Sequence, residues 1–182
     1  MINAYELLSL PPALVLPEET LRDAWRVAGK ITHPDAGGTE DGFAELRAAF
    51  ALLSSPSKRL LHWLELRGTP GEVRGRVDAD LMDLFSEIGA VSNRAEELIR
   101  KRDAAKSVLV RAMLEGETQL CREEVERAIA GVDVRMARET GVFPIYEAAA
   151  ELEIEDASRT ARNLAFLEKW RAGLRGIYAR LV

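Results

Sequence analysis

The segment Lys30–Gly38, "KITHPDAGG", brings a histidine and a carboxylate within two residues of each other. His33 is one of only two histidines in the chain, and Asp35 follows it across a single proline. Such a pair can act in proton transfer, but no Ser or Cys motif lies nearby to serve as a nucleophile. The other imidazole, His62, shows no metal-ligand spacing. We therefore expect no catalytic residue, no metal and no cofactor, and we predict that the protein is not an enzyme.

Helical sequence lies on both sides of this segment. Pro34 restricts the preceding residue to extended geometry, so the first helix must end near Thr32. The glycines at 37 and 38 then let the chain reverse. Apolar residues spaced three and four apart form a stripe on each side, and two such helices should pair antiparallel with the His–Asp pair at the exposed tip. The stripes are Leu21, Ala24, Trp25, Ala28 and Ile31 before the break, and Phe43, Leu46, Ala49, Phe50 and Leu53 after it.

A second face of the first helix is cationic. Arg22, Arg26 and Lys30 lie at positions i, i+4 and i+8. A stripe of this kind either is a solvated helix face or steers association with an acidic partner surface. Lys58 and Arg59 are possible additions to it.

Two shorter helices, "AYELL" and "SSPSKRLLHWLELRG", flank the hairpin. Taken together, "NAYELLSL", "LRDAWRVAGKIT", "HPD" and "FAELRAAFALLSSPSKRLLHWL" resemble a J domain over residues 3–68. Thr32 and Ala36 depart from the family pattern, which has an aromatic before HPD and a lysine after it. The family residues that remain in register in the last segment are Phe50, Leu53, Pro56 and Arg59.

The resemblance implies a partner and a set of contact residues. J domains dock on DnaK-type heat-shock chaperones and stimulate ATP hydrolysis through the HPD loop and the basic face of the second helix. In this picture Asp35 pairs with a basic group on the ATPase, and Pro34 fixes the direction in which it points. The chaperone-binding residues expected here are Arg22, Arg26, Lys30, His33, Pro34 and Asp35.

The second half of the chain reads as helical. We predict a J domain over residues 1–68, a linker over 69–76 and a three-helix hairpin or bundle over 77–182, which makes the protein all-α. The expected helices run over 77–114, then to about Glu139, and finally over 145–181. The weak boundary between the first two is "EGETQ", and the firm turn before the third is "TGVFP".

Three further segments resemble the HscB-type co-chaperones of iron–sulfur cluster assembly: "LLHWLELRG", "VDADLMDLFSEIG" and "ARNLAFLEKWRAGLRGIYARL". In that family, an apolar patch on the C-terminal domain holds the scaffold protein on which clusters are built. Carried over by alignment, the scaffold-binding patch would comprise Leu81, Met82, Phe85 and Phe166. The first three lie at i, i+1 and i+4, so one helical face can present them. The same residues could equally form the core of a helix bundle.

Several features keep other interpretations open. The family segment interleaves acidic residues with its apolar ones, whereas Ser86, Gly89 and Asn93 stand at roughly those positions here. The second domain is also longer than the resemblance leads us to expect. One alternative is a J-domain co-chaperone for a different client, with the C-terminal helices as a client-binding or dimerisation module. Another is a J-like fold with an unrelated role, which the intact HPD tripeptide disfavours.

Composition supports the same class of protein. The 182 residues carry a net charge of −5, which implies no broad basic surface for nucleic acid. Cys121 is the only cysteine, so no intrachain disulfide can form. No long uncharged apolar run suggests a membrane span or a secretion signal, so we expect a cytoplasmic protein with no membrane partner. The tryptophans at 25, 63 and 170 are expected to pack in cores or at domain contacts.

Overall fold

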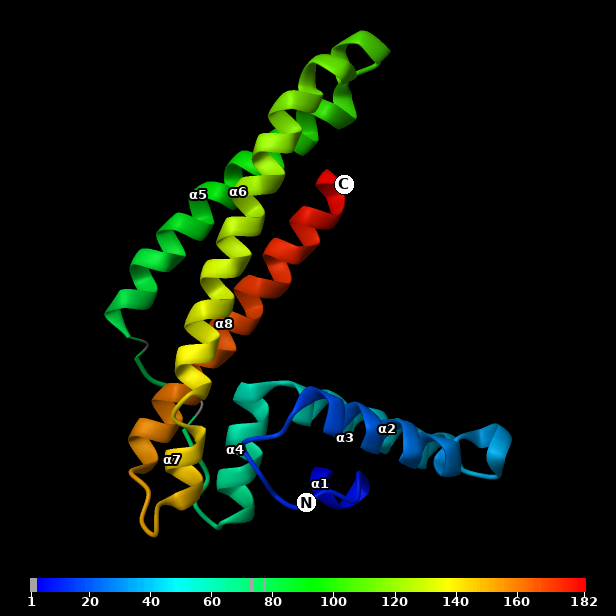
Figure 1. Cartoon of the computed structure of the whole chain (residues 1–182), viewed down its shortest axis with the longest axis vertical. Helices are drawn as coiled ribbons and strands as arrows, with labels where there is room; N and C mark the ends of the chain where they lie inside the picture. Colours follow the sequence, from blue (N-terminus) through cyan, green and yellow to red (C-terminus); the bar gives the residue numbers. More distant parts are fainter. Residues whose placement is uncertain (1–2, 73, 77) are drawn as a thin grey trace. The chain divides into compact units, whose positions relative to one another are not determined.

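The computed structural model describes residues 3–72, 74–76 and 78–182. Within these residues it contains eight α-helices, one 3-10 helix and no strand, which confirms the predicted all-α class (Figure 1). Among the described helices, none combines the length and the apolar character that crossing a lipid bilayer requires. The elements are α1 (Ala4–Leu7), α2 (Glu18–Thr32), η1 (Pro34–Ala36), α3 (Glu40–Ser54), α4 (Pro56–Leu66), α5 (Ala79–Ala104), α6 (Val108–Thr140), α7 (Phe143–Ala148) and α8 (Ile154–Leu181).

The chain forms two compact units. The N-terminal unit comprises Met1–Arg76 and Thr140–Ala165, and the C-terminal unit comprises Val77–Glu139 and Phe166–Val182. The single helix α8 therefore contributes its first turns to one unit and the rest to the other. The sequence-based division assigned residues 140–165 to the C-terminal domain, whereas their contacts group them with the N-terminal unit.

Short polar residues cap three α-helices of the N-terminal unit, α1, α3 and α4. The side chain of Asn3 accepts a hydrogen bond from the Tyr5 amide at the start of α1. Thr39 caps α3 in the same way, and Ser55 caps α4 directly before its N-terminal proline. These caps satisfy amides that a helix cannot pair internally, so the boundaries of the short helices are set locally.

Helices α2 and α3 pair as the sequence predicts. Leu21 of α2 and Leu46, Ala49 and Leu53 of α3 are buried in one core with α1. Ile31 is an exception, because it is 73% exposed instead of closing the stripe. It lies in the last turn of α2 at the edge of the apolar face, so its side chain points away from the core.

A buried histidine joins α1 to α4. The Nε2 atom of His62 accepts a hydrogen bond from the Ala4 amide at 3.1 Å, and its ring stacks on Tyr5. The Tyr5 hydroxyl donates to the carbonyl of Ala13 at 2.7 Å, and burial raises the pKa of Tyr5 to about 12. Burial lowers the pKa of His62, although the nearby Glu65 carboxylate opposes this. The neutral imidazole is therefore part of the fold.

Arg59 of α4 has a structural position. It is 8% exposed, and one guanidinium nitrogen donates to the carbonyl of Leu53 at 2.8 Å, which closes the α3–α4 turn. The expectation that Arg59 extends the cationic docking face is therefore corrected, since a buried guanidinium cannot meet a partner. Lys58 is exposed.

A second core in the N-terminal unit lies between α4, α7 and the first turns of α8. Its largest contributors are apolar side chains that are almost fully shielded from solvent. They are Leu14, Leu60, Trp63, Leu64, Phe143 and Leu164.

The segment predicted as a linker is tied to α8. The buried guanidinium of Arg162 donates to the carbonyls of Glu72, Arg74 and Arg76 at 3.1–3.3 Å and also pairs with Glu155 at 2.6 Å. The described part of this segment therefore has a defined path through the N-terminal unit.

The C-terminal unit is a three-helix arrangement of α5, α6 and the later part of α8. Each helix buries one apolar stripe against the other two. The core residues are Leu81, Ile88, Ala95, Leu98 and Ile99 of α5, Cys121, Val125 and Val132 of α6, and Leu167, Leu174, Ile177 and Leu181 of α8.

Two predicted helix boundaries are wrong. The first predicted helix ends at Ala104 instead of continuing to residue 114, and "EGETQ" lies inside α6. A β-carbon at Gly116 would meet nothing within 4 Å, so this glycine fits an exposed helix face without breaking it. The reversal occurs at 105–107, which contains neither glycine nor proline.

The predicted final helix over 145–181 is two helices. Helix α7 ends at Ala148 and α8 begins at Ile154. The break lies between residues that join the second core, since Tyr146 and Leu152 both pack against it. Burying both side chains in that core requires the chain to turn, and tertiary packing here overrides helix propensity.

We predict that Arg162→Ala lowers the free energy of unfolding by about 2–3 kcal/mol, because three carbonyls lose a charged donor. Urea denaturation followed by circular dichroism measures this. Lys169→Ala removes an exposed cation from the same helix and is expected to change stability by less than about 0.5 kcal/mol. Equal effects of the two substitutions would contradict the structural role of Arg162.

The unfolding free energy should also fall at mildly acidic pH because of His62. Since its folded-state pKa lies below the ordinary 6.5, the contribution of the neutral ring is complete above that pH and is lost as the pH falls through the lower value. Urea denaturation at about pH 7.5 and 5.5 tests this. His62→Gln keeps an acceptor for Ala4 and should reduce the loss, whereas Lys169→Ala on an exposed face of α8 should not.

Candidate functional site

The His33–Asp35 loop begins where α2 ends. The His33 amide still bonds to the carbonyl of Gly29 at 3.0 Å, but its ψ of 137° is extended. Pro34 then starts the 3-10 turn η1. His33, Pro34 and Asp35 are all exposed at the end of the α2–α3 hairpin (Figure 1). The proline thus converts a helix end into an outward-facing tripeptide.

The His33 ring has a fixed orientation within this exposed loop. Its Nδ1 atom accepts a hydrogen bond from the Asp35 amide at 3.2 Å, and its edge packs on Phe43 with ring centroids 5.1 Å apart. Because Nδ1 is an acceptor, the neutral ring carries its proton on Nε2, which is left to donate to a partner.

Asp35 is the most accessible charge of the loop. Its side chain is 92% exposed, and one carboxylate oxygen lies 3.5 Å from Nδ1 of His33. The carboxylate can therefore accept hydrogen bonds from a basic group on another protein without first leaving a buried position.

Two glycines return the chain into α3. Gly37 has a φ of +93°, which side-chain-bearing residues rarely adopt. The Gly38 amide donates to the His33 carbonyl at 3.1 Å, and a β-carbon on Gly38 would lie 2.0 Å from the Thr32 carbonyl oxygen. The backbone at Gly38 therefore packs directly against the backbone at Thr32 and His33, which fixes the conformation of the loop.

The predicted cationic stripe lies on the exposed side of α2. Arg22 pairs with Glu18, and Arg26 pairs with Asp23 at 3.0 Å. Lys30 is exposed and shows no ion pair with another residue in the described part of the chain. Acidic residues of α2 therefore neutralise part of the charge of the two arginines. Lys30, which lies nearest the loop, keeps the positive charge that is least neutralised by neighbouring residues.

An apolar element accompanies this stripe and was missed from the sequence. Val27 and Ile31 are 59% and 73% exposed and lie one turn apart on α2. This pair could have been predicted from the sequence, because Val27 and Ile31 are four residues apart and each directly follows a residue of the cationic stripe.

The predicted scaffold-binding residues are divided by the structure. Met82, Phe85 and Phe166 are 53%, 49% and 43% exposed, whereas Leu81 is only 1% exposed. The sequence left this face open between interface and core, and the structure buries one member of it and exposes the other three. Leu81 belongs to the core of the C-terminal unit.

Trp170 links the exposed aromatic residues. Its ring centroid lies 5.6 Å from that of Phe85 on α5 and 6.0 Å from that of Phe166 on α8. We call Met82, Phe85, Phe166 and Trp170 the aromatic patch. Sequence reasoning assigned Trp170 only to packing, although its i, i+4 spacing from Phe166 could have placed it here.

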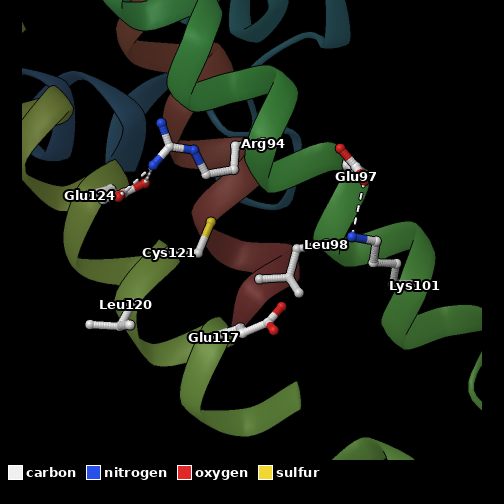
Figure 2. A pocket seen from close by; sticks show the side chains of 8 residues that line it. All are labelled: Arg94, Glu97, Leu98, Lys101, Glu117, Leu120, Cys121 and Glu124. Carbon is white, nitrogen blue, oxygen red and sulfur yellow. Dashed lines mark hydrogen bonds and ion pairs between the residues drawn. The ribbon is translucent and has the colours of Figure 1, made fainter. Parts of the chain in front are cut away.

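A shallow groove lies between α5 and α6 in the C-terminal unit (Figure 2). Nη1 of Arg94 bonds to both carboxylate oxygens of Glu124 across it, at 2.7 and 2.8 Å. Cys121 lies at its floor, where burial and the Glu124 charge raise the pKa of the thiol. A protonated thiol is a poor nucleophile. Within the described residues, no three His, Cys, Asp or Glu side chains gather as a metal site would require.

Comparison with known proteins bears on the N-terminal resemblance. The chain is 40% identical over 58 residues to two Arabidopsis thaliana proteins, Chaperone protein dnaJ 2 and Chaperone protein dnaJ 3. Over this stretch the chain is DnaJ-like. The alignment covers 32% of the present chain and 13% of each relative, so the chain spans a small part of the curated relatives it matches. No protein-family model matches the chain. The J-domain interpretation is thereby supported, and the HscB-type assignment stays a prediction.

We predict that Gly38→Ala destabilises the loop more than Gly37→Ala does. An alanine at 37 must hold a positive φ, which costs about 1 kcal/mol. An alanine at 38 forces two backbone segments apart, and we expect a loss above about 2 kcal/mol. Urea denaturation compares the stabilities, and amide chemical shifts of residues 32–39 report the displacement. A smaller effect at 38 than at 37 would contradict the close approach.

Proposed function

We propose that this protein is a J-domain co-chaperone that stimulates ATP hydrolysis by a DnaK-type or HscA-type chaperone. The observation that carries this is the exposed His33–Asp35 tripeptide at the tip of a helical hairpin, in a chain that is DnaJ-like over 58 residues. In the proposal the protein performs no chemistry itself, requires no cofactor and acts in the cytoplasm with its chaperone.

Each residue of the loop has a role in this proposal. Asp35 accepts from a basic group of the ATPase, and Pro34 fixes its direction. His33 holds the Asp35 amide through Nδ1, so the ring positions the carboxylate and offers Nε2 to the partner. Lys30, at the end of the cationic stripe with Arg22 and Arg26, attracts the acidic side of the chaperone, which raises the association rate more than the affinity.

The aromatic patch is the proposed binding surface for an iron–sulfur scaffold protein. The proposal rests on the resemblance of three segments to the HscB-type family and on the exposure of Met82, Phe85 and Phe166. Trp170 supports both phenylalanine rings, and clustered aromatic side chains are typical of residues that dominate binding energy. The cluster carried by the scaffold is cargo and needs no ligand from this chain. Delivery raises the concentration of the scaffold near the chaperone.

The alternative is a J-domain co-chaperone for another client. It is favoured by Ser86, Gly89 and Asn93, none of them acidic, where the family segment has acids. The aromatic patch would then bind a different apolar segment, or the C-terminal helices would serve as a dimerisation module.

Single-turnover ATP hydrolysis by the DnaK-type chaperones of the organism tests both parts. The protein alone should accelerate hydrolysis, and His33→Gln should reduce the acceleration by about tenfold or more, because contact with the ATPase is lost. Adding the scaffold should accelerate hydrolysis further. Phe85→Ala with Phe166→Ala should weaken this further effect, with about thirtyfold lower apparent affinity for the scaffold.

Val134→Ala is the matched control, because Val134 is a 72% exposed apolar residue of α6 that is not part of the aromatic patch. Leu81→Ala is unsuitable, since it would open a cavity in the core. Acceleration without any scaffold effect would refute scaffold delivery and leave the co-chaperone activity intact. No acceleration of any DnaK-type chaperone would refute both.

A further inference from the structure

The α5–α6 hairpin continues past the end of α8. In the C-terminal unit, Arg102 donates to the carbonyls of Arg180 and Leu181, and Arg122 donates to that of Leu181 at 2.8 Å. These bonds mark the last point at which α8 accompanies the other two helices, and Figure 1 shows the hairpin extending beyond it. We call residues 100–113 the hairpin tip.

The hairpin tip exposes large apolar side chains. Val108, Leu109 and Met113 are 83%, 70% and 73% exposed, and Val110 is 45% exposed. Single exposed apolar residues are ordinary on a protein surface, but four within six positions form a patch that needs a reason.

Residues 100–113 carry a net positive charge within an acidic chain, and the acids Glu97, Glu115 and Glu117 adjoin them. Five residues of the hairpin tip are cationic and one, Asp103, is acidic, which gives a net charge of +4 where the whole chain carries −5. Lys101 pairs with Glu97 outside the tip at 3.0 Å, and the side chain of Arg111 donates to the carbonyl of Ala105 at 2.9 Å. The cationic residues are Arg100, Lys101, Arg102, Lys106 and Arg111.

The directions of the apolar side chains distinguish possible partners. Successive helical residues point about 100° apart, so Val108, Leu109 and Val110 face three different sides of the first turn of α6. Met113 points between the last two. Leu109, Val110 and Met113 share one face at spacings of three and four, but Gly116 and Glu117 at the next such positions end this apolar stripe. A short apolar face at a helix end beside cations suits entry into the boundary layer of an anionic bilayer.

We propose that the hairpin tip inserts into lipid bilayers that contain anionic phospholipids. The apolar side chains enter the boundary between headgroups and acyl chains, and the surrounding cations bind lipid phosphates. Apolar burial and a basic cluster together provide the two signals that reversible membrane attachment requires. The expectation of no membrane partner was argued from the absence of a spanning segment, and the present proposal departs from it through a contact that uses one exposed turn. Tip-to-tip pairing of two copies is disfavoured, because two clusters of +4 would meet.

Co-sedimentation of the full chain with vesicles tests the proposal. We expect binding to phosphatidylcholine vesicles that contain phosphatidylglycerol, and at least about tenfold weaker binding to phosphatidylcholine alone. Lys106→Glu should weaken binding by about fivefold or more, because one attraction becomes a repulsion. High salt should weaken it as well.

Variants at exposed positions separate insertion from other causes. Leu109→Asp with Met113→Asp should abolish binding, whereas Val134→Asp, a substitution at a comparably exposed position of the same helix, should leave it unchanged. Circular dichroism checks that each variant is folded. Failure to bind anionic vesicles, or binding that survives the double substitution, would overturn the proposal. A dimer in sedimentation velocity that Leu109→Asp dissociates would also overturn it, by assigning the tip to a second copy.

Discussion

The geometry of the loop depends on one constraint, which is that a residue followed by proline is forced out of helical conformation. Pro34 applies this constraint to His33, whose ψ of 137° ends α2 one residue after Thr32. The extended residue turns its carbonyl toward the Gly38 amide and its ring toward Phe43. The end of one helix, the orientation of the imidazole and the return of the chain into α3 therefore have a single cause. Without the proline, the His–Asp pair would lie along a helix face.

In the C-terminal unit, the unequal reach of the three helices decides which apolar residues meet solvent. Where α5, α6 and α8 run together, Leu81 and its counterparts are buried. At the edge of this core, Phe85 and Phe166 are half exposed, and the ring of Trp170 contacts both of theirs. Beyond Leu181 only two helices remain, so the side chains of the hairpin tip have no third helix to pack against in the described structure. Both surfaces follow from where α8 begins and ends its contacts.

The sequence predicts most of the fold where local signals and packing agree. Proline and the apolar stripes predict α2 and α3 on either side of the loop, and the segment "SSPSKRLLHWLELRG" predicts α4. The reversal at 105–107 could not be predicted, since no glycine or proline marks it and Gly116 offers a false boundary. Likewise, Leu81 and Met82 are adjacent on an amphipathic helix, and only the position of α8 shows that one is core and the other surface. The tripeptide was recognisable, whereas the contact of Trp170 with Phe85 of another helix depends on tertiary structure.

The loop and the aromatic patch, the two surfaces proposed for co-chaperone function, rest on different physics. The loop presents a carboxylate, an imidazole N–H and a lysine in water, so its contribution depends on complementary charge and on ionic strength. The aromatic patch offers apolar area, and its rings already contact Trp170, so a partner that covers them pays less to immobilise them. The loop binds through charge and the aromatic patch through apolar contact, so a partner can bind to either surface while the other is free. A co-chaperone that must engage a client and an ATPase in succession requires this independence.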